Sequence, residues 1–195
     1  MKLLIATHNP GKEKDYKECL KDAPFEVVSL KDIGIGEEAP ENENTFTENA
    51  IKKVEFYSDL TGYPAIGDDG GLVIDALDGA PGVKSRRWLG YEMSDDEIIR
   101  TVLERMEGVP FQDRTCRLTC VVAYIDLSGE VFTEQCEVKG FIAEKPSVKK
   151  VEGYPYRSLF YFKNMGLYYS ELTEKQLKEI SHRRKTLLAI KEKIK

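Results

Sequence analysis

The sequence predicts an α/β protein, because segments with helical spacing of apolar residues alternate with short apolar or β-branched segments. Three segments begin with the Ser/Thr-x-x-Glu/Gln pattern of a helix capping box, at residues 45–48, 94–97 and 173–176. Residues 115–144 are rich in Val, Thr, Tyr, Phe and Cys, a composition typical of strands. With 195 residues, 41% of them hydrophobic, the chain is long enough for a single domain over 1–195 with one core or two small lobes.

The first predicted elements are a buried strand at residues 2–6, a helix from about residue 12 and a second strand at residues 25–30. The connection THNPGK, residues 7–12, contains three strong turn formers and leads into the helix start. The free backbone amides of a helix start form a natural anion seat. A plain strand-to-helix connection with a solvated lysine is the alternative, and the glycine spacing does not match a Walker motif.

A loop over residues 31–44 leads to the second predicted helix, which begins near Thr45. The helix has an inward stripe of apolar residues at helical spacing, namely Phe46, Ala50, Val54 and Tyr57. Asn49 and Lys53 are four residues apart and therefore share another face of the helix. This face brings an amide and a cation together.

Acidic residues lie on both sides of the second helix. Glu41 precedes it, and Asp68-Asp69-Gly70-Gly71 follows it as an expected turn, which leads into a short strand at residues 72–77. Magnesium prefers a few carboxylates together with water and phosphate oxygens, so Glu41 and Asp69 suit a Mg²⁺ and polyphosphate site. The remaining acid can orient or deprotonate water. Taken alone, the Asp-Gly pair indicates a β-turn, and the neighbouring groups carry the metal prediction.

A break at residues 79–82 precedes Ser85-Arg86-Arg87-Trp88, whose arginines could reach phosphate or lie solvated at the surface. A helix is then expected from Ser94 to Gly108. Residues 115–126 and 130–144 are predicted to form a long antiparallel hairpin.

The last part of the chain is basic and aromatic before it becomes helical. Aromatic residues between 147 and 162 could stack on a base or fill a core. A helix is expected from Thr173, and Ser181-His182-Arg183 is expected to precede a final amphipathic helix.

Composition excludes several classes of protein. A net charge of -5 and a pI near 5.3 argue against a nucleic-acid partner. The N-terminus MKLLIATHNP is too briefly apolar for a signal peptide, and no stretch approaches membrane-spanning length. The four cysteines are scattered, which is typical of buried free thiols in a reducing compartment. We therefore expect a cytoplasmic protein.

Several of these segments, in this order, resemble one known family. THNPGK, an acid followed by TFTENAIKK, PAIGDDGGL, GAPGVKSRRW and a late SHR are similar to the motifs of the inosine triphosphate pyrophosphatase family, also called the Ham1 or non-canonical purine NTP pyrophosphatases. The match is collinear from about Thr7 to Arg183. Five motifs in order with matching spacings are far more specific than any one of them.

The resemblance implies an elongated α/β fold in which helices flank a long mixed sheet, with two lobes around a central cleft, usually as a homodimer. It also implies Mg²⁺-dependent hydrolysis of nucleoside triphosphates, with ITP, dITP and XTP as substrates and with monophosphate and pyrophosphate as products.

Roles for single residues follow from the resemblance by position. Asp69 would be the water-activating base, with Asp68 and Lys53 as further catalytic residues. Glu41 and Asp69 would bind the metal. Substrate binding is implied for Thr7, Asn9, Lys12, Gly70, Arg87, Tyr156, Ser181, His182 and Arg183, of which the last three would read the 6-keto edge of the purine.

The sequence departs from the family pattern mainly in the half that reads the base. Arg157 stands where an acid is usual, Leu167 stands in place of a lysine, and Gly70 replaces the serine of the usual DDSG. An unpaired polar partner in a site changes substrate selection by about tenfold to a hundredfold. The base preference therefore stays open. A nucleotide-binding regulatory protein with weak catalysis and a pyrophosphatase with shifted base specificity are the alternative hypotheses.

Overall fold

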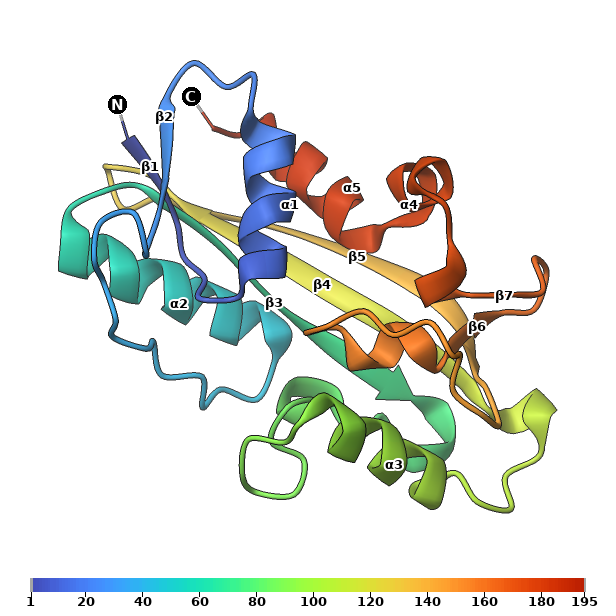
Figure 1. Cartoon of the computed structure of the whole chain (residues 1–195). Helices are drawn as coiled ribbons and strands as arrows, with labels where there is room; N and C mark the ends of the chain where they lie inside the picture. Colours follow the sequence, from blue (N-terminus) through green and yellow to red (C-terminus); the bar gives the residue numbers. More distant parts are fainter. Residues whose placement is uncertain (1, 195) are drawn as a thin grey trace. The chain divides into compact units, whose positions relative to one another are not determined.

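The computed structural model describes residues 2–194 and contains a mixed seven-stranded sheet of order β2-β1-β3-β4-β5-β6-β7 (Figure 1). Its strands are β1 (Lys2–Ile5), β2 (Glu26–Ser29), β3 (Ala65–Ile74), β4 (Thr115–Ile125), β5 (Val131–Ile142), β6 (Phe160–Phe162) and β7 (Leu167–Tyr168). Strand β1 pairs in parallel with β2 and β3, whereas β6 pairs antiparallel with β5 and β7. The predicted α/β fold with a mixed sheet is confirmed.

Five α-helices accompany the sheet in the described part of the chain. They are α1 (Pro10–Leu20), α2 (Phe46–Thr61), α3 (Asp95–Arg105), α4 (Glu174–Ile180) and α5 (His182–Lys191). The three predicted capping boxes are confirmed at the starts of α2, α3 and α4, where Thr45, Ser94 and Thr173 are the N-caps. None of these helices is both long and apolar enough to cross a bilayer.

The chain divides into two compact units. Unit 1 consists of Met1–Gly70, Cys120–Cys136 and His182–Lys195, and unit 2 consists of Gly71–Thr119 and Glu137–Ser181. Strands β4 and β5, joined by a turn in which the Asp126 amide donates to the Glu130 carbonyl, are the predicted hairpin.

Unit 1 has an apolar core on each face of its part of the sheet. On one face α1 and α5 pack in a cluster whose main members are Leu3, Ile5, Tyr16, Leu20, Ile66, Cys120, Val122, Leu187 and Ile190. On the other face α2 packs in a second cluster, with Leu4, Ala50, Val54, Tyr57, Ala65 and Val121 among its members. Because successive strand residues point to opposite faces, neighbouring residues of β3 and β4 serve different cores.

Unit 2 has one core. Helix α3 packs there against the ends of β3 and β4 and against the aromatic segment that contains β6, through residues that include Leu72, Ile98, Val102, Cys116, Phe160 and Tyr169. The aromatic residues Phe160, Phe162 and Tyr169 contact one another in this core. Core filling, one of the two predicted uses of the aromatic residues between 147 and 162, is confirmed for Phe160 and Phe162.

The segment Asp68-Asp69-Gly70-Gly71 is not a turn, as the sequence suggested, but the middle of strand β3. The expected strand at 72–77 has the wrong bounds, because β3 begins earlier, at Ala65, and ends at Ile74, where residues 75–77 continue as a 3-10 turn. At Gly71 a Cβ would overlap the Ser85 hydroxyl and lie 2.7 Å from the Gly82 carbonyl oxygen. This glycine therefore permits a close approach of two segments and does not make a turn.

Candidate active site

Asp68 lies at the centre of a buried cluster of charges in unit 1. Its side chain is on β3 and the residue is 1% exposed. One carboxylate oxygen, Oδ2, lies 3.0 Å from the Lys12 ammonium of α1 and 3.2 Å from the Arg183 guanidinium of α5. The other oxygen, Oδ1, accepts a hydrogen bond of 3.1 Å from the Tyr16 hydroxyl.

This environment keeps Asp68 ionised. Burial raises the pKa of a carboxyl group, but the charges of Lys12, Arg183 and Lys53 outweigh burial and hold the Asp68 pKa well below its usual range. With both oxygens engaged and a depressed pKa, Asp68 is a poor proton acceptor. The geometry therefore makes Asp68 an anchor for cations rather than a general base.

Lys53 approaches the same strand from α2. Its ammonium donates to the backbone carbonyl of Asp68 at 3.1 Å and forms an ion pair with Glu41. Burial lowers the pKa of Lys53, but the charges of Glu41, Asp69 and Asp68 outweigh it, so the pKa is raised and the ammonium stays charged. The sequence prediction that Lys53 and Glu41 belong to one site is supported by this ion pair.

Asp69 differs from Asp68 because only one of its two carboxylate oxygens accepts a hydrogen bond within the described residues. Its Oδ1 accepts a hydrogen bond of 2.8 Å from the Gly70 amide. Its Oδ2 is buried and has no hydrogen-bond partner among the described residues. Burial raises the Asp69 pKa against the lowering effect of Lys53 and Lys12, and Glu41 adds to the rise. Asp69 is thus a stronger base than an exposed aspartate.

The Asp69 oxygen that has no hydrogen-bond partner among the described residues, Oδ2, is suited to bind a divalent cation. A bound cation would satisfy Oδ2, and Glu41 is the second carboxylate near the same ammonium. No group of three or more His, Cys, Asp or Glu residues suited to a metal occurs within residues 2–194. Proteins nevertheless commonly supply only one or two carboxylate ligands to Mg²⁺, which takes its other ligands from water and phosphate.

The loop that carries Glu41 is tied to α2. Asn49, which is 2% exposed, accepts a hydrogen bond of 3.1 Å from the Glu43 amide through its side-chain oxygen. Lys52 forms an ion pair with the Glu43 side chain. The capped helix therefore positions Lys53 directly and the Glu41 loop through Asn49.

The turn before α1 uses its amides within the turn itself. The side chain of Asn9 caps α1 and accepts hydrogen bonds from the amides of Gly11 at 2.9 Å and Lys12 at 3.1 Å. The hydroxyl of Thr7 accepts from the Asn9 amide at 3.2 Å. Two amides of the expected anion seat are thus already bonded within the turn, and Lys12 is the cation that follows them.

The predicted base-reading residues are divided between the units. His182 and Arg183 form the first turn of α5 in unit 1, not a segment before the helix, and Ser181 is the last residue of unit 2. Arg183 also lies 3.7 Å from Asp15.

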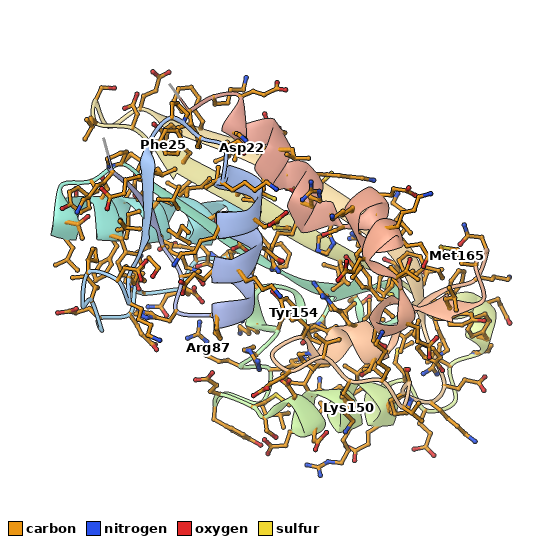
Figure 2. The ribbon with its side chains drawn as sticks, turned by 45° about the horizontal axis from the view of Figure 1, so that its top comes forward. Asp22, Phe25, Arg87, Lys150, Tyr154 and Met165 are labelled. Carbon is orange, nitrogen blue, oxygen red and sulfur yellow. The ribbon has the colours of Figure 1, made fainter. Side chains whose placement is uncertain are left out.

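In unit 2 several side chains at or near predicted positions make local contacts. The hydroxyl of Tyr156 donates to the Ser85 carbonyl at 2.5 Å, and burial raises its pKa. The guanidinium of Arg157 lies 4.0 Å from the ring centroid of Tyr154. Arg87 is exposed on the same unit, and Figure 2 shows its side chain. Leu167 packs partly buried against the core of unit 2.

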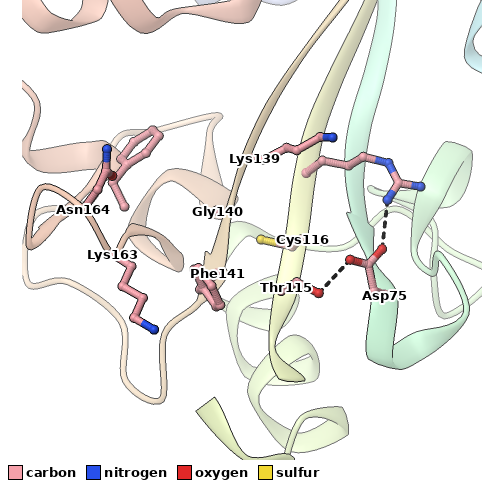
Figure 3. A pocket seen from close by; sticks show the side chains of 10 residues that line it. Asp75, Thr115, Cys116, Lys139, Gly140, Phe141, Lys163 and Asn164 are labelled. Carbon is pink, nitrogen blue, oxygen red and sulfur yellow. Dashed lines mark hydrogen bonds and ion pairs between the residues drawn. The ribbon is translucent and has the colours of Figure 1, made fainter. Parts of the chain in front are cut away.

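A separate cavity of about 900 Å³ lies in unit 2 (Figure 3). Its lining includes Cys116, Lys139, Phe141 and Lys163 and contains no residue of the predicted site. The Asp75 carboxylate at its rim accepts hydrogen bonds from Thr115 at 2.7 Å and Arg117 at 2.8 Å. This cavity is therefore distinct from the charge cluster around Asp68.

Sequence reasoning missed the part played by Tyr16 of α1, whose hydroxyl contacts Asp68. A signal was present, because Tyr16 lies four residues after Lys12 and so shares its helix face. Cys120 was also read only as a buried thiol. Its sulfur lies 3.8 Å from Asp68 Oδ2, and burial together with the Asp68 charge raises its pKa to about 12.

Comparison with known proteins shows which family the chain is similar to. A model of the Ham1 family matches residues 3–193. The dITP/XTP pyrophosphatase of Geobacter sulfurreducens is 36% identical over 191 residues, which are 98% of this chain and 95% of that protein. The protein of the same name from Bacillus subtilis is 40% identical over 180 residues, covering 92% and 90% of the two chains.

Solved structures are similar over the same length. A HAM1 protein from Coxiella burnetii has a TM-score of 0.87 at 31% identity, covering 98% of this chain and 97% of that one. The Staphylococcus aureus Ham1 protein has a TM-score of 0.86 at 29% identity, with the same coverage. From the family match over nearly its whole length, the chain belongs to the Ham1 family.

Proposed function

We propose that this protein hydrolyses non-canonical purine nucleoside triphosphates, such as dITP, XTP and ITP, to the monophosphate and pyrophosphate. The observation that carries the proposal is the Asp69 carboxylate, which is buried beside Lys53 and has one oxygen, Oδ2, without a hydrogen-bond partner among the described residues. The relatives from Geobacter sulfurreducens and Bacillus subtilis are named dITP/XTP pyrophosphatases, which supports the substrate class.

The residues divide the reaction between them. The ammonium groups of Lys12 and Lys53 bind the triphosphate and offset its charge as the anhydride bond breaks. The Asp69 carboxylate accepts a proton from the attacking water, whose oxygen bonds to phosphorus as pyrophosphate leaves. Asp68 keeps Lys12 in place without taking the proton, because its pKa is depressed and both its oxygens are engaged.

Magnesium is the cation that we propose for Glu41 and Asp69. When bound, it would supply positive charge to the phosphate oxygens. The protein's contribution is to hold the two carboxylates near Lys53, one on β3 and one on the loop fastened to Asn49. Thr7, Asn9, Gly70, Arg87, Tyr156, Ser181, His182 and Arg183 stay proposed substrate-binding residues. Homodimer assembly stays a prediction from the resemblance, and a cytoplasmic location stays a prediction from the composition.

A panel of canonical and deaminated nucleoside triphosphates with Mg²⁺ tests the proposal. We expect release of pyrophosphate, not orthophosphate, with dITP, ITP or XTP turned over faster than dATP or dGTP. If dATP or dGTP were turned over as fast as dITP, ITP and XTP, the proposed substrate class would be wrong and the protein would be a pyrophosphatase with shifted base specificity. Nucleotide binding in calorimetry with no product after hours would instead support the regulatory alternative.

A further inference from the structure

Helix α1 holds the Asp68 carboxylate with two side chains. Lys12 and Tyr16 are four residues apart, so both lie on the face of α1 that meets β3. The Lys12 ammonium contacts Oδ2 at 3.0 Å, whereas the Tyr16 hydroxyl contacts Oδ1 at 3.1 Å. The two residues thus bind different oxygens of the same carboxylate, which determines the rotation of that carboxylate about its side chain.

The Tyr16 hydroxyl is the hydrogen-bond donor that the described residues provide to Oδ1. The other side-chain contacts of Asp68, from Lys12, Arg183 and Cys120, all go to Oδ2. Tyr16 is completely buried in the apolar cluster under α1, so water cannot easily replace its hydroxyl. Burial and the Asp68 charge raise the Tyr16 pKa, so the hydroxyl keeps its proton and remains a donor.

We propose that Tyr16 is a positioning residue of the phosphate site, where its hydroxyl fixes the Asp68 carboxylate and thereby the Lys12 ammonium. The inference rests on the proposed function in taking the ligand of Lys12 to be a polyphosphate. Without the hydroxyl, a buried charged oxygen has no donor, and the carboxylate rotates to share Lys12 and Arg183 between its two oxygens. Lys12 then moves away from the position that meets phosphate.

The test compares Tyr16→Phe with Tyr124→Phe. Tyr124 lies in the same apolar cluster and is 2% exposed, and its hydroxyl forms no hydrogen bond with the site among the described residues, so its variant controls for the loss of a tyrosine hydroxyl from this cluster. Calorimetry with inorganic pyrophosphate and Mg²⁺ measures affinity, and steady-state kinetics with dITP measure KM and kcat. We expect Tyr16→Phe to weaken pyrophosphate binding and raise KM by about 5- to 30-fold, with a smaller change in kcat. Tyr124→Phe should match the wild type.

A second comparison, made in the Lys12→Gln variant, separates a positioning role of Tyr16 from a general loss of stability. In Lys12→Gln the ammonium is already gone, so adding Tyr16→Phe should weaken pyrophosphate binding by less than about threefold. Fully additive effects would overturn the proposal, and so would a Tyr16→Phe protein with a lower melting temperature but unchanged affinity and KM. A Tyr16→Phe chain that does not fold would show a general structural role and would also overturn it.

The outcomes for the proposed function are separate. If the wild type binds pyrophosphate but hydrolyses no nucleoside triphosphate, the proposed function fails, while the affinity comparison still decides the role of Tyr16. If the wild type neither binds pyrophosphate nor turns over dITP, both proposals are wrong.

Discussion

Asp68 and Asp69 are adjacent in sequence and have opposite chemistry in the structure. Successive residues of a strand face opposite sides of the sheet, so Asp68 meets Tyr16 and Arg183 on the side of α1 and α5. Asp69 faces the side of α2, near Lys53. The pKa of the first is depressed and that of the second is raised. One acid therefore holds cations and the other is suited to accept a proton.

Substitution of each acid by its amide should separate these roles. We expect Asp69→Asn to lower kcat by about 10²- to 10⁴-fold with little loss of stability, because a neutral amide removes the base and costs less to bury than a charge. Asp68→Asn should instead reduce the free energy of unfolding by about 3–5 kcal/mol, because Lys12 and Arg183 lose their buried counter-charge.

Pyrophosphate release and thermal melting of both variants give the measurement. An Asp69→Asn protein with undiminished pyrophosphate release would remove Asp69 from the role of base. An Asp68→Asn protein as stable as the wild type would contradict the anchoring role of Asp68.

Helix α2 is the element that organises the proposed metal side. Its start is capped by Thr45 and Glu48, and its next turns present Asn49 and Lys53. The Asn49 side-chain oxygen accepts a hydrogen bond from the Glu43 amide, and Lys53 forms an ion pair with Glu41. One helix thus holds the loop at two places, by an amide and by an ammonium.

Loosening the loop at Asn49 should change the metal requirement. We expect Asn49→Ala to raise the Mg²⁺ concentration for half-maximal activity by about tenfold, because residues that support a metal ligand affect affinity on that scale. Thr45→Ala is the matched control, since it should cost about 1 kcal/mol of stability at the same helix and leave the Mg²⁺ requirement unchanged. Equal Mg²⁺ titrations of Asn49→Ala and the wild type would disprove the coupling.

Elements with local signals could be predicted from the sequence, and those set by distant partners could not. The capping boxes at Thr45, Ser94 and Thr173 involve residues three apart, so the sequence shows them directly. The strand through Asp68 and Asp69 was read as a turn because Asp-Gly pairs are turn formers. Two buried acids in a strand are tolerable only when Lys12, Lys53 and Arg183 surround them, and these cations come from three separate helices.

The same distinction between local signals and distant partners applies to the residues of the candidate site. Glu41, Lys53 and Asp69 were predicted to lie together from their places around one helix, and the Glu41–Lys53 ion pair and the field of both charges at Asp69 agree. The contact of the Tyr16 hydroxyl could not be predicted from helical spacing, because the spacing of apolar residues shows which side of a helix is buried and not which polar atom lies against it. The expected cleft between two lobes stays a prediction.

At the scale of the molecule, the two ends of the described chain share one core. Strand β1 and helix α1 pack with α5 in a single apolar cluster of unit 1 that includes Leu3, Leu187 and Ile190. Helix α5 also carries Arg183, which reaches Asp68. The stability of unit 1 and the arrangement of its charge cluster therefore depend on the same C-terminal helix.

Two adjacent leucines of α5 test this dependence. Leu187 is completely buried and Leu188 is 42% exposed. We expect Leu187→Ala to lower the free energy of unfolding by about 2–5 kcal/mol through lost contacts and a cavity, and Leu188→Ala to change it by less than about 0.5 kcal/mol. Denaturant unfolding of both variants measures the difference, and similar midpoints for the two would show that α5 does not contribute to the core.

The acceptor that Lys53 uses on β3 is the backbone carbonyl of Asp68, not its side chain. A backbone carbonyl oxygen is present whichever amino acid occupies the position. A substitution at residue 68 that preserves the strand therefore leaves the acceptor of this Lys53 hydrogen bond in place. The attachments of Lys12 and Arg183 to the carboxylate have no such protection. In a lineage that lost the acid at position 68, Lys53 would keep its 3.1 Å hydrogen bond to the strand, whereas Lys12 would keep only a 3.5 Å contact with the same carbonyl and Arg183 would keep its contact with Asp15.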